Sequence, residues 1–208
     1  MQTFVFILEM IGTIAFAASG AMTALKKNMD IFGIAILGIT TAVGGGAMRD
    51  IILGKTPPTM FEKPIYAAVA AAVSIIVFFP FVRRLLNKNQ YIYDHAMRVM
   101  DSLGLAIFTV MGINAAKNIS DGHNLFLLVF VGVITGVGGG LMRDIMAGDT
   151  PYIFVKHVYA CASIAGALVA ALIWDLLGAV AAMFIGAVLI FTIRMLAAHY
   201  KWSLPHAK

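Results

Sequence analysis

The chain has 208 residues, of which 61% are hydrophobic and 12% charged, whereas soluble proteins average about 45–50% apolar and 25% charged residues. This composition indicates a membrane protein and leaves no room for a soluble catalytic domain, because one span takes about 20 residues. The single cysteine, Cys161, excludes an intrachain disulfide and a cysteine-rich metal site. The net charge of +5 does not indicate nucleic-acid binding, since the basic residues lie between apolar runs and act as topology signals.

Apolar runs of spanning length predict seven transmembrane helices in an all-α membrane protein. In chain order they cover residues 3–25, 31–53, 64–82, 96–116, 124–147, 155–173 and 176–198. We expect the first run to be a mature span and not a cleaved signal peptide, because no Lys or Arg precedes it. Pro80 is expected to kink or end the third helix.

The second and fifth runs end in a duplicated segment. Residues 44–57 (GGGAMRDIILGKTP) reappear as residues 138–151 (GGGLMRDIMAGDTP), with ten of fourteen positions identical. Each copy lies in a unit of three predicted spans, and since three is odd, the second unit enters the membrane from the opposite side. The sequence therefore predicts two inverted three-helix repeats, residues 1–88 and 89–175, followed by a seventh helix and tail, residues 176–208.

The distribution of basic residues predicts the orientation, because cytoplasmic connectors are enriched in Lys and Arg. One side of the predicted topology receives Lys26, Lys27, Arg83, Arg84, Lys88, Lys156, Lys201 and Lys208, whereas the other receives Lys55, Lys63 and Lys117. We therefore expect the N-terminus outside and the C-terminus in the cytoplasm.

Three consecutive glycines occur in each copy: Gly44, Gly45 and Gly46, and then Gly138, Gly139 and Gly140. Each glycine in a helix interior costs about 1 kcal/mol relative to alanine, so we expect helix breaks whose free backbone groups coordinate ions. The alternative is close helix packing through a small-xxx-small face, which both copies also carry. Packing alone does not require three glycines in a row, and both interpretations stay open.

An Arg-Asp pair follows each glycine run, and charged residues inside spans usually face an aqueous path or a partner. Glu9 and Asp101 occupy equivalent positions in the two repeats. We predict the ion pairs Glu9–Arg49 and Asp101–Arg143, with Asp50 and Asp144 left to attract cations or to cap the second half-helices. The alternative is that these charges extend to the membrane interface.

The two Gly-Gly-Gly-x-Met-Arg-Asp segments, each in the second helix of a three-helix unit, resemble the prokaryotic branch of the trimeric intracellular cation (TRIC) channels. The resemblance implies a homotrimer in which each protomer has its own pore for monovalent cations, chiefly K⁺. It also implies that the second and fifth helices line this pore, and that the membrane is a prokaryotic plasma membrane. Membrane lipids and a second and third copy of the chain are the expected partners, and no cofactor is expected.

A secondary transporter of a small solute, such as the amino acid glycine, shares this architecture and is the alternative function. It requires a polar substrate pocket near the midplane, for which only Thr40, Thr41, Ser74, Thr135 and Ser163 are candidates. An enzyme is not expected, because no His/Glu, Ser/His or Cys cluster is present.

Overall fold

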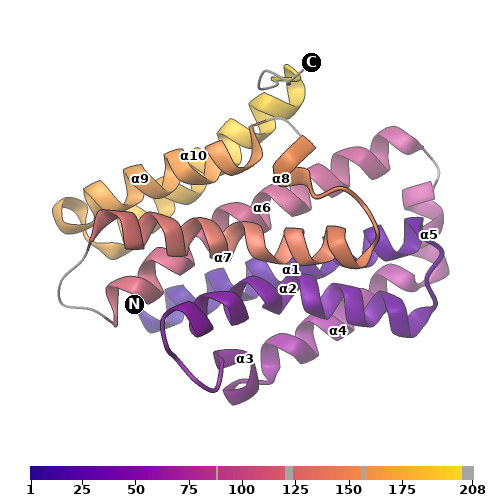
Figure 1. The fold of residues 1–208 in the computed structure, drawn as a ribbon. Helices are drawn as coiled ribbons and strands as arrows, with labels where there is room; N and C mark the ends of the chain where they lie inside the picture. The colour runs from indigo at the N-terminus through magenta and orange to yellow at the C-terminus, as the bar shows by residue number, and fades with distance from the viewer. Residues whose placement is uncertain (88, 120–123, 156–157, 203–208) are drawn as a thin grey trace.

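The structure is a computed structural model that describes all residues except 88, 120–123, 156–157 and 203–208. The described residues form helices and connecting turns and no strand (Figure 1). The helices are α1 (Gln2–Lys26), α2 (Ile31–Ile52), α3 (Thr59–Glu62), α4 (Ile65–Phe78), α5 (Pro80–Asn87), α6 (Gln90–Lys117), α7 (Leu125–Met146), α8 (Tyr152–Val155), α9 (Tyr159–Leu177) and α10 (Ala179–His199). The all-helical prediction is therefore confirmed for this part of the chain.

In the described part of the chain, six helices are long and apolar enough to cross a membrane, namely α1, α2, α6, α7, α9 and α10, and α4 is a shorter apolar helix of 14 residues. The predicted third span is shorter because Phe79 is extended and Pro80 begins α5, as the missing N–H of proline requires. Two other predicted bounds also move. Asp175 lies inside α9 and not in a connector, and the turn falls at Gly178, so the last helix begins at Ala179 instead of residue 176.

The glycine runs do not break their helices. Both α2 and α7 stay helical from their first residue to their last, through all six glycines. The prediction of a helix break is therefore wrong. Each helix ends instead a few residues later, at a glycine with positive φ, Gly54 and Gly148, a conformation that side chains disfavour.

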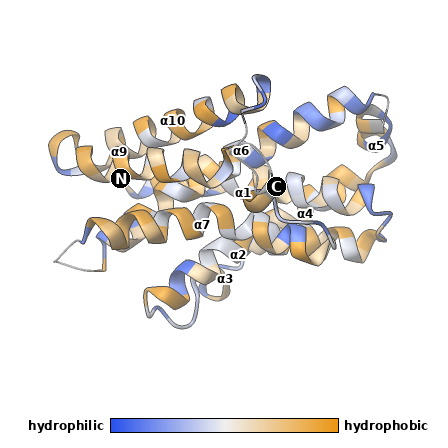
Figure 2. Ribbon diagram, turned by 45° about the horizontal axis from the view of Figure 1, so that its top comes forward, coloured by the Kyte–Doolittle hydropathy of each residue, from blue (hydrophilic) through white to orange (hydrophobic). Residues whose placement is uncertain are grey.

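The helices form two groups of three, and two pairs of helices join the groups. α1, α2 and α4 pack on one another, as do α6, α7 and α9, while α2 lies along α7 and α1 along α6 between the groups (Figure 1). α10 lies against α9 and α6. Figure 2 shows apolar residues along the helices and hydrophilic residues at their ends, as a membrane-spanning bundle requires.

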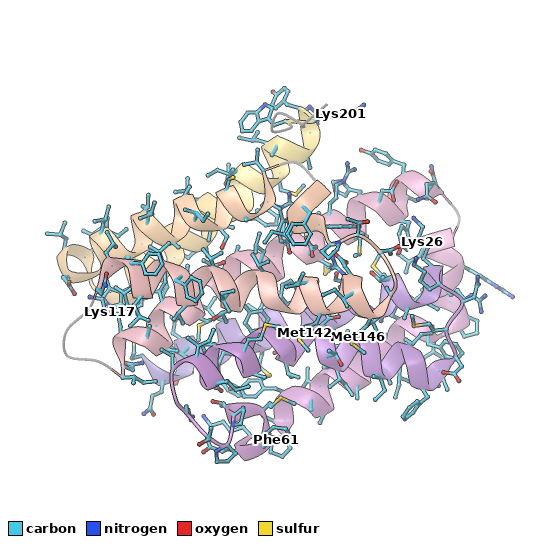
Figure 3. All side chains as sticks on the ribbon, in the orientation of Figure 1. Lys26, Phe61, Lys117, Met142, Met146 and Lys201 are labelled. Carbon is cyan, nitrogen blue, oxygen red and sulfur yellow. The ribbon has the colours of Figure 1, made fainter. Side chains whose placement is uncertain are left out.

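An ion pair lies at each end of the bundle, between two connectors at one end and between the ends of α6 and α9 at the other. Lys27 Nζ lies 2.5 Å from Asp149 Oδ1, and at the other end Lys117 Nζ lies 3.1 Å from Asp175 Oδ1. Lys26 and Lys117 mark these opposite ends in Figure 3. We call the end with Lys27 the inner end and the end with Lys117 the outer end. Of the basic residues used for the orientation, Lys88, Lys156 and Lys208 lie outside the described residues.

Candidate functional site

The first two glycines of each run bring α2 and α7 into close contact. A Cβ on Gly45 would collide with the carbonyl oxygen of Thr135 on α7, and a Cβ on Gly139 would collide with that of Thr41 on α2. Similarly, a Cβ on Gly44 would lie 2.5 Å from Met142 Sδ, and one on Gly138 would lie 2.9 Å from Met48 Sδ. The contacts are reciprocal, so each repeat makes room for the other, and close helix packing accounts for these four glycines.

The third glycine of each run faces a charged cluster and not the opposite helix. A Cβ on Gly46 would meet only Arg49, at 3.8 Å, and one on Gly140 would meet the Tyr159 hydroxyl at 2.9 Å and Asp101 at 3.6 Å. Consecutive helical residues point about 100° apart. In each run, the first two glycines therefore leave no side chain between α2 and α7, and the third leaves none between its helix and the charged cluster.

A pair of phenylalanines packs between α1 and α6 near this crossing. The Phe16 and Phe108 rings lie 5.3 Å apart between centroids, and both side chains are buried. Phe16 lies over Gly104, and Phe108 lies over Gly12, so this contact is reciprocal as well. The result is an apolar layer in the middle of the bundle.

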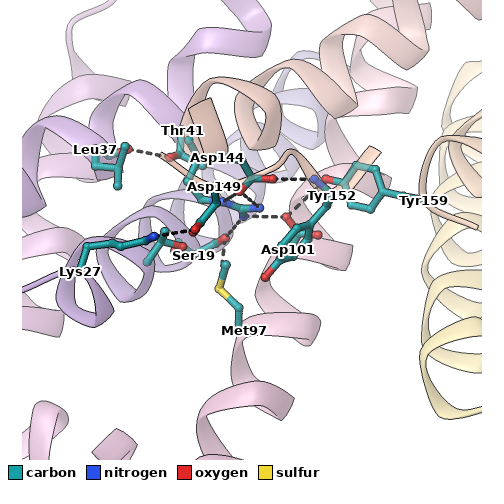
Figure 4. Close-up of polar contacts among 12 residues, drawn as sticks. Ser19, Lys27, Leu37, Thr41, Met97, Asp101, Asp144, Asp149, Tyr152 and Tyr159 are labelled. Atoms are coloured by element: carbon teal, nitrogen blue, oxygen red, sulfur yellow. Dashed lines mark hydrogen bonds and ion pairs between the residues drawn. The ribbon is translucent and has the colours of Figure 1, made fainter. Parts of the chain in front are cut away.

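At the inner end, a fully buried charge cluster surrounds Asp101 (Figure 4). Arg143 Nη1 donates to Asp101 Oδ1 at 2.8 Å, which confirms the predicted Asp101–Arg143 pair. Arg143 also donates to the Ser19 hydroxyl, and Tyr159 Oη donates to Asp101 Oδ1 at 3.3 Å. On the other side of the carboxylate, Arg194 Nη2 lies 3.6 Å from Asp101 Oδ2. We call Asp101, Arg143, Asp144, Tyr159 and Arg194 the inner cluster.

At the outer end, the equivalent cluster is assembled differently. Tyr66 Oη donates to Glu9, as Tyr159 does to Asp101, and Arg49 Nη2 lies 2.7 Å from Asp50 Oδ1. No ion pair joins Glu9 to Arg49 in the described chain, so this predicted pair is wrong. Arg49 makes only the pair with its chain neighbour Asp50, a pair that Arg143 also makes with Asp144. We call Glu9, Arg49, Asp50 and Tyr66 the outer cluster.

Asp50 and Asp144 are not left free, as the sequence suggested, but anchor the connectors that follow their helices. Asp50 Oδ2 accepts from the Thr59 N–H at 2.7 Å, and Asp144 Oδ2 accepts from the Tyr152 N–H at 2.8 Å. Both N–H groups lie at the start of a short helix, α3 and α8. The predicted cap on a second half-helix is wrong, because α2 and α7 have no break; the two carboxylates cap the short helices α3 and α8 instead.

Two cavities open toward the two clusters. The inner cavity has a volume of about 460 Å³ and reaches Asp101 and Arg194. The outer cavity has a volume of about 40 Å³ and is bounded by Glu9, Gly46 and Phe108. The described residues contain no group of three His, Cys, Asp or Glu that could hold a metal ion. The polar groups that both cavities offer are charged side chains and hydroxyl groups.

Three residues of the clusters were not predicted as site residues. Tyr66 and Tyr159 repeat at an offset of 93, but a tyrosine near a span end also fits an interfacial anchor. Arg194 is a charged residue within the last predicted span, a signal that indicates an internal partner. Because α10 has no repeat counterpart, no pattern in the sequence identified Asp101 as that partner.

Comparisons with known proteins agree with this architecture. A family model described as "Glycine transporter" matches residues 6–81 and 98–175. The inner membrane protein YadS of Escherichia coli strain K12 is 36% identical over 97% of this chain and 95% of its own length. A structure described under conductance through TRIC cation channels is 35% identical, with a TM-score of 0.84 over 97% of this chain and 96% of its own. The TRIC channel orthologue from Rhodobacter sphaeroides is 30% identical, with a TM-score of 0.87 over 96% and 99%.

Proposed function

The chain belongs to the trimeric intracellular cation (TRIC) channel family, and on this premise we propose that it conducts monovalent cations, chiefly K⁺. It is an integral multi-pass membrane protein and not an enzyme. We further propose a homotrimer with one pore in each protomer, built from two inverted repeats and the seventh helix. The proposed setting is a prokaryotic plasma membrane, with the outer end of the bundle outside the cell.

The observation that carries this proposal is the pair of cavities at opposite ends of one bundle. Each reaches a charged cluster, and the apolar layer of Phe16 and Phe108 lies between them. A narrow apolar segment between two wet cavities stops ions by dewetting. This arrangement supports the proposal of a pore that is closed in this structure.

The glycine faces suit the wall of such a pore. Gly46 lines the outer cavity and places no side chain between α2 and the outer cluster, so water and a cation can approach the backbone there. Gly140 instead lies against the Tyr159 hydroxyl. We propose that opening separates Phe16 on α1 from Phe108 on α6, which clears a path beside the place where α2 crosses α7. The two helices then line the path with their glycines, while Asp50 and Asp144 hold the connectors beside the mouths.

The transporter alternative is less well supported. The candidate hydroxyls of Thr41, Ser74 and Thr135 donate to carbonyls of their own helices, and Ser163 bonds to Thr109 at 2.7 Å. These four groups are already satisfied and buried, which leaves only the partly buried Thr40 of the five candidates to offer a polar group to a substrate.

The test is single-channel recording of the purified protein in planar bilayers under a KCl gradient. We expect discrete currents that reverse near the K⁺ equilibrium potential. Gly46→Leu should lower the unitary conductance severalfold, because its side chain would enter the outer cavity that Gly46 lines, and its Cβ would meet no atom closer than 3.8 Å.

The control is Ala68→Leu, at an exposed position of α4 outside both cavities, and the retention volume in size-exclusion chromatography should show whether each variant folds. Silence of the wild-type protein at all voltages, together with saturable glycine uptake into liposomes from the same preparation, contradicts the channel and favours the transporter.

A further inference from the structure

The two mouths of the protomer carry opposite charge. The outer cavity is lined by two carboxylates, Glu9 and Asp50, and one guanidinium, Arg49. The inner cavity is lined by five basic side chains, those of Lys26, Lys27, Arg98, Arg194 and Lys201. Among the described residues, three carboxylates line it, those of Asp94, Asp101 and Asp149. The outer mouth therefore has one negative charge in excess, and the inner mouth has two positive charges in excess.

This difference is not a consequence of the repeated fold. At the repeat offset of 92, the three basic residues Lys26, Lys27 and Arg98 correspond to the uncharged Asn118, Ile119 and Phe6. Arg194 and Lys201 come from the seventh helix and the residues after it, which have no repeat counterpart. The two repeats are thus equivalent in fold but place different fixed charges at the two cavities.

Fixed charge at a mouth changes the local concentration of permeant ions. A potential of one thermal unit (kT) raises or lowers the concentration of a monovalent cation about threefold, and clefts with low-dielectric walls reach several such units. Cations should therefore be enriched at the outer mouth and depleted at the inner one, so the rate of entry differs between the two directions.

We propose that the open pore rectifies, passing cations more readily from the outer mouth to the inner mouth than in reverse, with Glu9 as the residue that concentrates cations at the outer mouth. The inference rests on the proposed channel function and adds its preferred direction. Glu9 is suited to this role because Tyr66 donates to its carboxylate and no cation is paired with it in the described chain.

The experiment measures the open-channel current at equal positive and negative voltages in symmetric 0.1 M KCl. The amplitude of the open level is used because it does not depend on how often the pore opens. We expect the current carried by cations entering at the outer mouth to exceed the reverse current about threefold. In 1 M KCl the ratio should approach one, since the Debye length falls from about 10 Å to about 3 Å.

The orientation of the channel in the bilayer is determined with a thiol introduced at the inner mouth. In a Cys161→Ala background, Lys201→Cys is treated with a membrane-impermeant, negatively charged thiol reagent added to one chamber. Modification should raise at once the current of cations that enter from that chamber, because it adds negative charge to the inner cavity. The same reagent should leave the Cys161→Ala protein unchanged.

Two charge-removing variants and two matched controls complete the test. Glu9→Gln should lower the larger current, and Arg98→Gln should raise the smaller one, so each moves the ratio toward one. Glu62→Gln removes a carboxylate from the outer end, and Arg84→Gln removes a guanidinium from the inner end, both outside the cavities. Neither control should change the ratio.

A wild-type current that is equal in both directions at 0.1 M KCl overturns the rectification and leaves the channel function standing. A ratio that Glu9→Gln does not change, or that changes equally in Glu62→Gln, overturns the role of Glu9. The absence of any wild-type current overturns the channel function and the rectification with it.

Discussion

Asp101→Ala is expected to destabilise the protein by about 3–5 kcal/mol, the usual cost of removing one partner from a buried ion pair. The inner cluster holds two carboxylates, Asp101 and Asp144, and two guanidiniums, Arg143 and Arg194, and all four side chains are at most 5% exposed. Removing Asp101 leaves two buried positive charges with one carboxylate. The free energy of unfolding can be measured by SDS titration in mixed micelles, with tryptophan fluorescence as the signal.

Charge balance can be separated from lost packing by a second substitution. Asp101→Ala combined with Arg194→Met restores one guanidinium to one carboxylate, so the double variant should recover part of the lost stability. Asp149→Ala is the control: it removes a carboxylate that is 42% exposed and pairs with Lys27, which is worth about 1 kcal/mol or less. If the double variant is no more stable than Asp101→Ala, charge balance is not what the cluster provides.

Gly45→Ala should destabilise the protein strongly, whereas Gly46→Ala, one residue later, should be tolerated. The added methyl group at position 45 would collide with backbone atoms of α7, which cannot rotate away as a side chain can. Overpacking of this kind costs about 1–3 kcal/mol. At position 46 the nearest atom is an Arg49 nitrogen at 3.8 Å, an ordinary contact distance.

This pair of variants has a mirror in the second repeat, because Gly139 meets Thr41 as Gly45 meets Thr135. Gly139→Ala should therefore destabilise as Gly45→Ala does in the same SDS titration. Equal tolerance of alanine at 45, 46 and 139 would show that the helices are not held by close backbone contact. Recordings on the Gly46→Ala protein should still give currents, since one methyl group leaves the cavity open.

The helical fold, the number of apolar segments and the inner ion pair could be predicted from the sequence. Apolar length reports membrane spans directly, and a duplicated segment pairs equivalent residues, which led to Asp101–Arg143. The helix break could not be judged from composition. Glycine weakens an isolated helix, but here the carbonyls of the opposite helix fill the space that its missing side chain leaves.

The predicted ion pair Glu9–Arg49 was wrong for a related reason. Equivalent positions predict equivalent contacts only where every neighbour is equivalent too. Tyr66 and Tyr159 do act alike, but Glu9 has one methylene more than Asp101, and the outer cluster lacks a counterpart of Ser19 and Arg194. With these partners changed, Arg49 keeps the pair with Asp50 that Arg143 also makes with Asp144. It makes no ion pair with Glu9 in the described chain, a difference that depends on side-chain geometry and not on spacing.

The inner cluster also constrains the order in which the protein can be completed during synthesis. Asp101 is separated from Arg143 by 42 residues, and Arg194 follows only in the last helix. When the ribosome has just released α6, the membrane segment contains the carboxylate of Asp101, but its partners Arg143 and Arg194 have not yet been synthesised. Such a segment is costly in lipid, so α6 should remain beside the aqueous path of the insertion machinery until α7 arrives. The final helix then closes the cluster, which makes assembly of the inner end a late step that the earlier helices cannot reach alone.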